Sequence, residues 1–406
     1  MSKNVCFLIT EHPFLDARIF KKEAKSLHGE GYQVTMIVPT KNGYLFDVDG
    51  SIFHQQFRSQ TFIHEGIKIV TYEQMYPENQ LKNLHYNLHS GHHSRFTDPL
   101  TQLGIAQQAD IYHAHEFFSL YSGVGIKRAL ATKGRECKLI YDSHELEPDP
   151  LVVESRTIKK LKNEMLISML NETDHVITVS QSIKDCYGEI NPAIPINVIY
   201  NSPPLASNYK PRQGKRNELT IAFEGMMDSK RGSFNKLMEI IALSNKSFDL
   251  RVRIIGGRKK SDRNQHPPIP SHIVDKIEYR GWINYDSIPE AMKGCDIGWV
   301  DLDAEHSLNN RYAMPNKFFS YLNNGLPVIA NQCTDMAKFI QKYDCGCIVE
   351  KQQAQAKDYA QVLLYLHAHR ERIFTMGKNA RRLMETTFSW EHMREKLFDV
   401  YNQLDQ

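Results

Sequence analysis

Histidines and carboxylates stand at the ends of two hydrophobic runs in the first half of the chain. The run ADIYHAH carries His113 and His115 and is followed by Glu116, and the run KLIYDSH ends at His144. Side chains two apart on a strand share a face, so His113 and His115 are expected to point the same way. Imidazole and carboxylate groups at strand ends suit proton transfer or hydrogen bonding to a polar substrate. For His144 the alternative is a strand-capping residue that hydrogen-bonds its neighbours. A metal site on the paired histidines would need further ligands, so we expect none.

A cationic, glycine-containing segment follows the run LTIAFEG in the second half. Gly225 ends this run, and Lys230, Arg231 and Gly232 come before a segment with helical periodicity. Fixed cations and free backbone N–H groups at the start of a helix form an anion site. We therefore predict a phosphate site here, with a merely solvated turn as the alternative.

Short β-rich runs alternate with amphipathic segments along the chain, which predicts parallel βα units. The alternation stops once, between about Val198 and Leu219, where three prolines and several polar residues replace the apolar periodicity. We predict an α/β protein with a first Rossmann-like domain over 1–203, a linker over 204–218 and a second Rossmann-like domain over 219–386. A C-terminal helix over 387–406 is expected to pack back on the first domain. Open sheets bind ligands at the carboxyl ends of their strands, so the site is expected in a cleft between the two domains.

Composition narrows the class of protein. The chain has 406 residues and a formal net charge of +3, which is too small to indicate a nucleic-acid partner. The seven cysteines are scattered apart from Cys345 and Cys347, which favours a reducing compartment over a disulfide framework. The start lacks the features of a signal peptide, and no apolar stretch approaches the ~20 residues needed to span a bilayer. These observations predict a cytoplasmic protein.

Four segments, in order along nearly the whole chain, resemble the retaining family 4 glycosyltransferases of the GT-B superfamily. They are HPFLDARIFKKEAKSLHGEGYQV, ADIYHAHE with KLIYDSHE, FEGMMDSKRG, and MPNKFFSYLNNGLPVIA. The resemblance implies two doubly wound domains facing each other across a cleft. It also implies transfer of a hexose-type sugar, with retention, from a nucleotide sugar, most simply a UDP sugar, to a hydroxyl acceptor. No metal or other cofactor is implied, and cell-envelope or capsular polysaccharide biosynthesis is the expected setting.

The resemblance also assigns roles to residues. It implies that His144 faces the donor sugar and that Arg231 neutralises the departing diphosphate. For Asp16 and Arg18 it implies a reach toward the donor phosphates, although a charge pair at a helix N-terminus explains them equally well. The predicted donor residues are Asp16, Arg18, Gly225, Lys230, Gly232, Gly281, Asn316, Lys317 and Ser320, and the predicted acceptor-side residues are His113, His115 and Glu116.

Two positions depart from the family pattern. Ser320 stands where members usually carry a glutamate that binds the nucleotide ribose, and Met226 stands where an arginine often follows the first loop glycine. A serine hydroxyl is shorter and uncharged, so it reaches a ribose only by closer approach or through water. These departures keep open two other functions, a catalytically weak or inactive nucleotide-binding subunit and a nucleotide-sugar epimerase.

The segment SRTIKKLKNEMLISML has the pattern of a basic amphipathic helix. Such a helix can lie on an anionic membrane and bring the protein to a lipid-linked acceptor. The alternative is a helix that packs its apolar side in the core and solvates its basic side. A peripheral location at the inner face of the membrane is thus one expectation.

Overall fold

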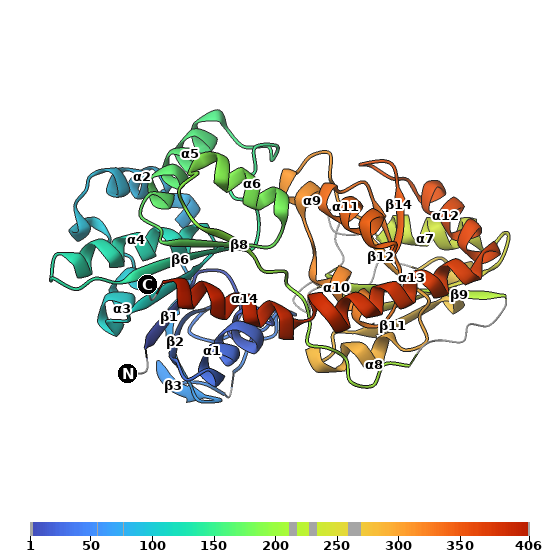
Figure 1. Cartoon of the computed structure of the whole chain (residues 1–406), viewed down its shortest axis with the longest axis horizontal. Coiled ribbons are helices and arrows are strands. Elements are labelled where there is room, and N and C mark those ends of the chain that lie inside the picture. The colour runs from blue at the N-terminus through green and yellow to red at the C-terminus, as the bar shows by residue number, and fades with distance from the viewer. Residues whose placement is uncertain are drawn as a thin grey trace. The chain divides into compact units, whose positions relative to one another are not determined.

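The chain folds into two compact units (Figure 1). The computed structural model describes residues 3–54, 56–75, 77–210, 217–226, 234–258 and 269–404. The first unit comprises Met1–Ile199 together with Arg394–Gln406, and the second comprises Tyr200–Met393. The chain therefore passes from one unit to the other twice.

The first unit is built on a twisted sheet with strand order β3-β4-β2-β1-β5-β6-β7-β8 among the described residues. Every neighbouring pair is parallel except β3 and β4, which are antiparallel. The strands are apolar runs because most of them are buried on both faces. They are β1 (Asn4–Ile9), β2 (Gln33–Thr40), β3 (Thr61–His64), β4 (Ile67–Glu73), β5 (Ile111–His115), β6 (Lys138–Ser143), β7 (His175–Thr178) and β8 (Ile196–Val198).

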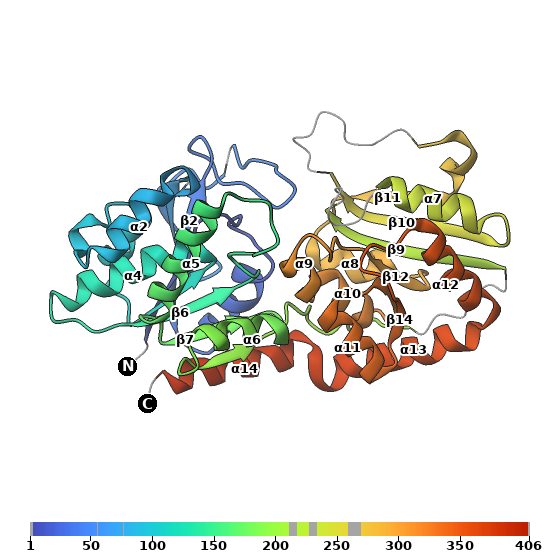
Figure 2. The same ribbon diagram turned by 90° about the horizontal axis from the view of Figure 1, so that it is seen from above.

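Helices cover both faces of this sheet. Crossovers that leave β1 toward β2 and β5 toward β6 run in opposite directions, so right-handed connections place their helices on opposite faces. Helices α1 and α14 lie on the same face of this sheet (Figures 1 and 2). The helical segments are η1 (Ile19–Ala24), α1 (Lys25–Gly29), η2 (Pro77–Gln80), α2 (Leu81–His89), η3 (His93–Arg95), α3 (Pro99–Gln107), α4 (Phe117–Ala131), α5 (Arg156–Leu170), α6 (Gln181–Ile190) and α14 (Trp390–Gln403).

The second unit has a fully parallel sheet in the order β11-β10-β9-β12-β13-β14 among the described residues. Its strands are β9 (Glu218–Met226), β10 (Asp249–Gly257), β11 (Ile277–Gly281), β12 (Ile297–Val300), β13 (Val328–Asn331) and β14 (Gly346–Val349). Its helical segments are α7 (Phe234–Ser244), η4 (Ser271–Lys276), η5 (Tyr285–Ser287), α8 (Ile288–Met292), α9 (Leu308–Tyr312), α10 (Asn316–Asn323), α11 (Thr334–Tyr343), α12 (Ala356–Ala368), α13 (Arg370–Leu383) and η6 (Met384–Phe388).

The predicted α/β class with two Rossmann-like sheets is confirmed. The core of the second unit shows why, because β9 and β10 present Ile221, Phe223 and Val252 to the apolar sides of α7 and α12. Within the part of the chain that the structure describes, no helix is long and apolar enough to span a bilayer.

Helix α5 corresponds to the predicted basic amphipathic segment. Its apolar residues Met165, Leu166, Met169 and Leu170 are buried in the first unit. Lys162 is also buried and pairs with two glutamates. The apolar side of α5 thus packs in the core, so this side is not the surface that would enter a membrane.

Candidate functional site

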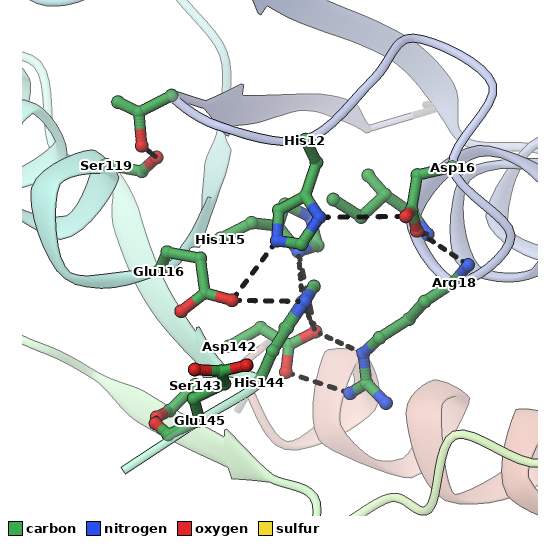
Figure 3. A network of polar contacts seen from close by, with 12 residues as sticks. His12, Asp16, Arg18, His115, Glu116, Ser119, Asp142, Ser143, His144 and Glu145 are labelled. Carbon is green, nitrogen blue, oxygen red and sulfur yellow. Dashed lines mark hydrogen bonds and ion pairs between the residues drawn. The ribbon is translucent and has the colours of Figure 1, made fainter. Parts of the chain in front are cut away.

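Three polar side chains meet at one edge of the first sheet (Figure 3). His12 follows β1, Glu116 follows β5 and His144 follows β6. These three strands are neighbours in the order β1-β5-β6 and all parallel, so their carboxyl ends lie at the same edge. This is the edge where open α/β sheets bind ligands.

Beneath these residues lies a buried ion pair between Arg18 and Asp142. The Arg18 Nε and Nη2 atoms donate to the two Asp142 carboxylate oxygens over 3.0 and 2.8 Å, and Nη1 donates to the Ile199 carbonyl over 3.1 Å. Glu23 adds a contact of 2.9 Å to Arg18 Nε. Although burial opposes ionisation of the carboxyl, the guanidinium holds the pKa of Asp142 well below its usual range. A buried ion pair therefore sits under the histidines, with its carboxylate next to His115 and His144.

His113 and His115 stack on the same face of β5, as predicted from their spacing, with ring centroids 4.5 Å apart. Both are fully buried. His113 Nδ1 lies 2.9 Å from the Tyr401 hydroxyl, and His115 Nδ1 lies 3.2 Å from His144 Nε2. Burial lowers the pKa of both rings, so each is neutral at ordinary pH. Any contribution of these rings to an acceptor site is indirect, through His144.

The accessible layer consists of His12, Glu116 and His144, whose side chains are 26%, 13% and 11% exposed. Glu116 Oε1 lies 3.1 Å from His12 Nε2 and 3.4 Å from His144 Nδ1. Burial works against protonation of His12, but hydrogen bonds to Asp16 and Glu116 raise its pKa well above the ordinary value. His144 Nε2 lies 3.4 Å from Asp142 Oδ2. Each of the two rings thus has a carboxylate on both of its nitrogens.

Glu116 carries backbone strain at this point. Its φ of 75° and ψ of 167° lie in a region that is populated almost entirely by glycine. A non-glycine residue there costs about 1–3 kcal/mol and persists only where its surroundings hold it. Its amide donates to the Asp142 carbonyl over 3.1 Å, which fixes the turn from β5 into α4. The strain places the carboxylate between the two histidines.

In the second unit the predicted donor residues gather at the carboxyl end of β9. Gly225 adopts a φ of 100°, and a side chain there would touch Lys317, whose Nζ lies 4.3 Å from the centre of the Phe223 ring. Ser320 of α10 is buried and donates to Glu224 Oε1 over 3.3 Å. A carboxylate is therefore present beside Ser320, although it comes from the strand and not from the helix.

The remaining predicted donor residues fall into two groups. Asn316 opens α10, one residue before Lys317, and Gly281 ends β11 with a φ of 65°. Lys230, Arg231 and Gly232 lie outside the described residues. The structure thus brings Gly225, Lys317 and Ser320 together, whereas Gly281 belongs to the edge strand.

Two expectations are revised. Arg18 is buried and its guanidinium is used by Asp142, Glu23 and Ile199, so it does not reach a donor phosphate. Asp16 Oδ1 accepts from the amides of Arg18 and Ile19, which is the helix N-terminal role named as the alternative.

Sequence reasoning missed His12, Glu23 and Glu224. Only His12 had a signal, because it stands in the loop after the first predicted strand and therefore at the same edge as His144.

Two groups of described residues have ligand atoms close enough to hold a metal ion. One contains Glu23, His113, His115 and Asp142, and the other contains His12, Glu116 and His144. In the first group the Arg18 guanidinium occupies both carboxylates, and this permanent cation opposes a metal ion there. The second group has no such cation among its contacts in the described chain.

A cavity of about 730 Å³ lies within the second unit. It is lined by the segment before Tyr209, by Met292 of α8, by the turn at Gly325 and by Phe374 of α13. Asp296 and Leu326 precede β12 and β13, so the cavity opens at the amino ends of these strands. Of the predicted donor residues that the structure describes, Ser320 lines it, whereas Gly225 and Lys317 do not.

Both halves of the chain match family models. Residues 17–204 match the model described as Glycosyltransferase Family 4, and residues 237–399 match the model described as Glycosyl transferase-like. No curated protein is significantly similar in sequence.

Solved structures with the same fold span the whole chain. Sucrose-phosphate synthase from Thermosynechococcus elongatus is 14% identical, with a TM-score of 0.70 over 100% of this chain and 99% of that one. HepE from Anabaena in complex with UDP is 13% identical, with a TM-score of 0.70 over 99% of this chain and 100% of that one. The lipopolysaccharide outer core galactosyltransferase WaaB is 12% identical, with a TM-score of 0.61 over 98% and 99% of the two chains. At these identities the likeness shows the fold.

Proposed function

Since this chain is a glycosyltransferase with the GT-B fold, we propose that it moves a hexose from a UDP sugar to a hydroxyl acceptor with retention of anomeric configuration. The observation that carries the proposal is the position of His144. Its ring is partly exposed at the carboxyl edge of the first sheet, and Glu116 and Asp142 hold its two nitrogens. Because the ring is already oriented, a sugar hydroxyl that takes the place of Glu116 at Nδ1 would bind it with little further loss of side-chain freedom.

The nucleotide part of the donor is assigned to the second unit. Solved structures of HepE hold UDP and UDP-glucose, which supports a uridine nucleotide here. Lys317 lies beside Gly225 and supplies a cation for the diphosphate. Glu224 accepts from Ser320, and its carboxylate is proposed to bind the ribose hydroxyls in place of the glutamate that Ser320 replaces. Arg231, assigned by sequence resemblance, is proposed to neutralise the leaving diphosphate.

The proposed reaction needs no protein nucleophile and no metal. The bond between the sugar anomeric carbon and the diphosphate oxygen breaks, and the diphosphate leaves with the electron pair. The acceptor hydroxyl oxygen bonds to the anomeric carbon from the face that the diphosphate leaves, and its proton passes to a departing phosphate oxygen. The protein contributes orientation and fixed positive charge, which act most strongly where water is excluded.

A cell-envelope or capsular glycan is the proposed acceptor. The name of WaaB places that structural neighbour in lipopolysaccharide outer core assembly, which supports this class of acceptor. Peripheral membrane contact is part of the proposal, because Leu151, Val152 and Val153 are exposed directly before the basic start of α5. Flotation with anionic liposomes at low salt tests this part, and a protein that stays in the soluble fraction removes it.

The function is tested by incubating the chain with a panel of UDP sugars and hydroxyl acceptors and measuring UDP release and product anomer. His144→Ala is expected to lower kcat/KM by about 100-fold or more, as loss of a fixed polar contact to a reacting group does. The exposed helix residue His89 supplies the control, and His89→Ala is expected to leave transfer unchanged. Equal activity of wild type and His144→Ala would end the assignment of His144.

The same assays separate the two alternative functions. A chain that binds UDP but releases no UDP from any UDP sugar would be a nucleotide-binding subunit. Ser320, in place of the usual glutamate, would agree with that outcome. Isomerisation of the donor sugar without acceptor indicates an epimerase. Transfer is expected to persist with a chelator present, and a strict requirement for an added divalent ion would contradict the proposed reaction.

A further inference from the structure

We infer that His12, Glu116 and His144 form a binding site for one divalent transition-metal ion of the Zn²⁺ type. The ligand atoms are His12 Nε2, Glu116 Oε1 and His144 Nδ1. Two imidazoles and one carboxylate are a donor set that Zn²⁺ takes with a fourth position left for water or substrate.

The distances between the ligand atoms match tetrahedral coordination. Metal–ligand bonds of about 2.0–2.1 Å at tetrahedral angles place neighbouring ligand atoms about 3.3–3.4 Å apart. Glu116 Oε1 lies 3.1 Å from His12 Nε2 and 3.4 Å from His144 Nδ1, and the three residues each bring one ligand atom within 4.8 Å of the others. Two of the three spacings are therefore in place.

The outer contacts of both imidazoles support metal binding. A metal-bound histidine commonly has its second nitrogen next to a carboxylate, which fixes the ring and strengthens it as a ligand. His12 Nδ1 lies 3.6 Å from Asp16 Oδ2, and His144 Nε2 lies 3.4 Å from Asp142 Oδ2. Both rings thus have the outer carboxylate on the nitrogen that faces away from Glu116 (Figure 3).

Charge and access agree with this assignment. Arg18 neutralises Asp142 from below, while Asp16 and Glu116 contribute negative charge around His12. The partly exposed side chains leave the site open on one side for a metal and its fourth ligand. Imidazole ligands favour Zn²⁺, Co²⁺ or Ni²⁺ over Mg²⁺, which prefers oxygen ligands.

The backbone at Glu116 is an independent indication. A glycine would relieve the strain at φ 75° and ψ 167°, yet the chain carries a glutamate there. The strain holds a carboxylate at the midpoint between two imidazoles. It also means that Glu116→Gly removes the ligand and the strain together, so this variant is expected to fold.

The site has a consequence for transfer, and this consequence rests on the proposed function. A metal on His144 Nδ1 removes that nitrogen from the sugar and places a cation where the donor is handled. Zn²⁺ is therefore expected to inhibit transfer, and a chelator is expected to restore it.

The experiment measures metal binding directly. Untagged, metal-free protein is titrated with Co²⁺, and the visible absorption of tetrahedral cobalt is recorded, followed by displacement with Zn²⁺. One equivalent is expected to bind per chain, with Mg²⁺ giving no displacement. Glu116→Gly and His12→Ala are each expected to weaken Co²⁺ binding more than 100-fold, and Asp16→Asn by about 10–100-fold. His89→Ala is the control and is expected to bind as the wild type does.

Circular dichroism establishes that each variant is folded. Wild-type protein without tetrahedral cobalt absorption overturns the inference, and so does binding that survives in Glu116→Gly and His12→Ala. Since the readout is the metal and not the sugar, metal binding with no transfer activity would refute the proposed function while leaving the site intact. Transfer that Zn²⁺ does not affect, in a chain that fails to bind Co²⁺, would refute the site alone.

Discussion

Ser320 of helix α10 and Glu224 of strand β9 form a buried hydrogen-bonded pair. The helix residue donates and the strand residue accepts, over 3.3 Å. We expect that one carboxylate at this point binds the ribose of the nucleotide. Either position 320 or position 224 could carry it, but not both. Two adjacent buried carboxylates repel each other and cannot both ionise without cost.

The first prediction exchanges these residues. Ser320→Glu alone is expected to lower the free energy of unfolding by about 2 kcal/mol or more and to weaken UDP binding, because a second charge is buried beside Glu224. The double variant with Glu224→Ser added is expected to recover most of both quantities. Chemical denaturation and calorimetric titration with UDP measure them, and a double variant no better than Ser320→Glu would contradict the pairing.

The second prediction concerns Lys22, a buried lysine in η1. Burial, helped by the nearby Arg18 guanidinium, lowers the pKa of Lys22 to about 7. In the unfolded chain its pKa is about 10.4, so between these values the unfolded state binds more protons and stability rises with pH. The free energy of unfolding of the wild type, relative to Lys22→Met, is therefore expected to increase from pH 7 to pH 10 by at most about 1.4 kcal/mol per unit.

Lys25→Met is the matched control, because Lys25 lies nearby in α1 and is exposed. Its effect on stability is expected to stay nearly constant over the same range. A Lys22→Met difference that does not change with pH would show that Lys22 is charged in the folded protein.

At the scale of elements, the ends of β9 and β10 approach too closely for side chains. Gly225 and Gly256 are paired in register, and both have left-handed backbones, with φ of 100° and 106°. A Cβ on Gly256 would lie 2.5 Å from the Gly225 carbonyl oxygen. The backbone here cannot move without disturbing the strand end next to Lys317.

The third prediction compares two glycines of the second unit. Gly256→Ala adds both a strained φ and a clash with backbone, and is expected to cost clearly more than the ~1 kcal/mol of φ strain alone. Gly294→Ala has a φ of 85° but nothing within 4 Å of its Cβ, so it carries only the strain. Thermal unfolding and UDP affinity are the measurements. Equal losses for the two variants would mean that the strands separate easily.

The strands of both sheets could be predicted because parallel strands buried on two faces are apolar runs. Strands β3 and β8 have no such apolar run, since β3 is a half-exposed edge strand and β8 has only three residues. The histidines of the site could be predicted because the carboxyl ends of parallel strands meet at one edge of a sheet, where ligands bind. Arg18 was misassigned because its carboxylate partner Asp142 is 124 residues away, and no local pattern reveals a buried partner at that distance.

At the scale of the molecule, the two units have separate cores and are expected to unfold in two calorimetric transitions. UDP, assigned to the second unit, is expected to raise the Tm of one transition only, and to raise the free energy of unfolding of that unit by about 2.7 kcal/mol at 100 times its Kd.

Tyr401→Phe is expected to lower the Tm of the other transition. It should lower the free energy of unfolding of the first unit by about 1–2 kcal/mol, because it leaves the buried His113 Nδ1 without its hydroxyl partner. Tyr365→Phe, on an exposed side chain of α12, is the control. A single transition that UDP shifts as a whole would contradict this independence.

Arg394–Gln406 belong to the first unit although they follow the whole second unit in the sequence. Tyr401 reaches His113 only after the whole second unit has been synthesised, so a ribosome releases the first sheet before its final helix exists. A fragment that stops at Ile199 lacks this helix and is expected to expose His113 to solvent. The first unit is therefore made of two separate segments of the chain. A synthetic peptide that covers the end of α14 is expected to bind the fragment that stops at Ile199 and to restore its stability.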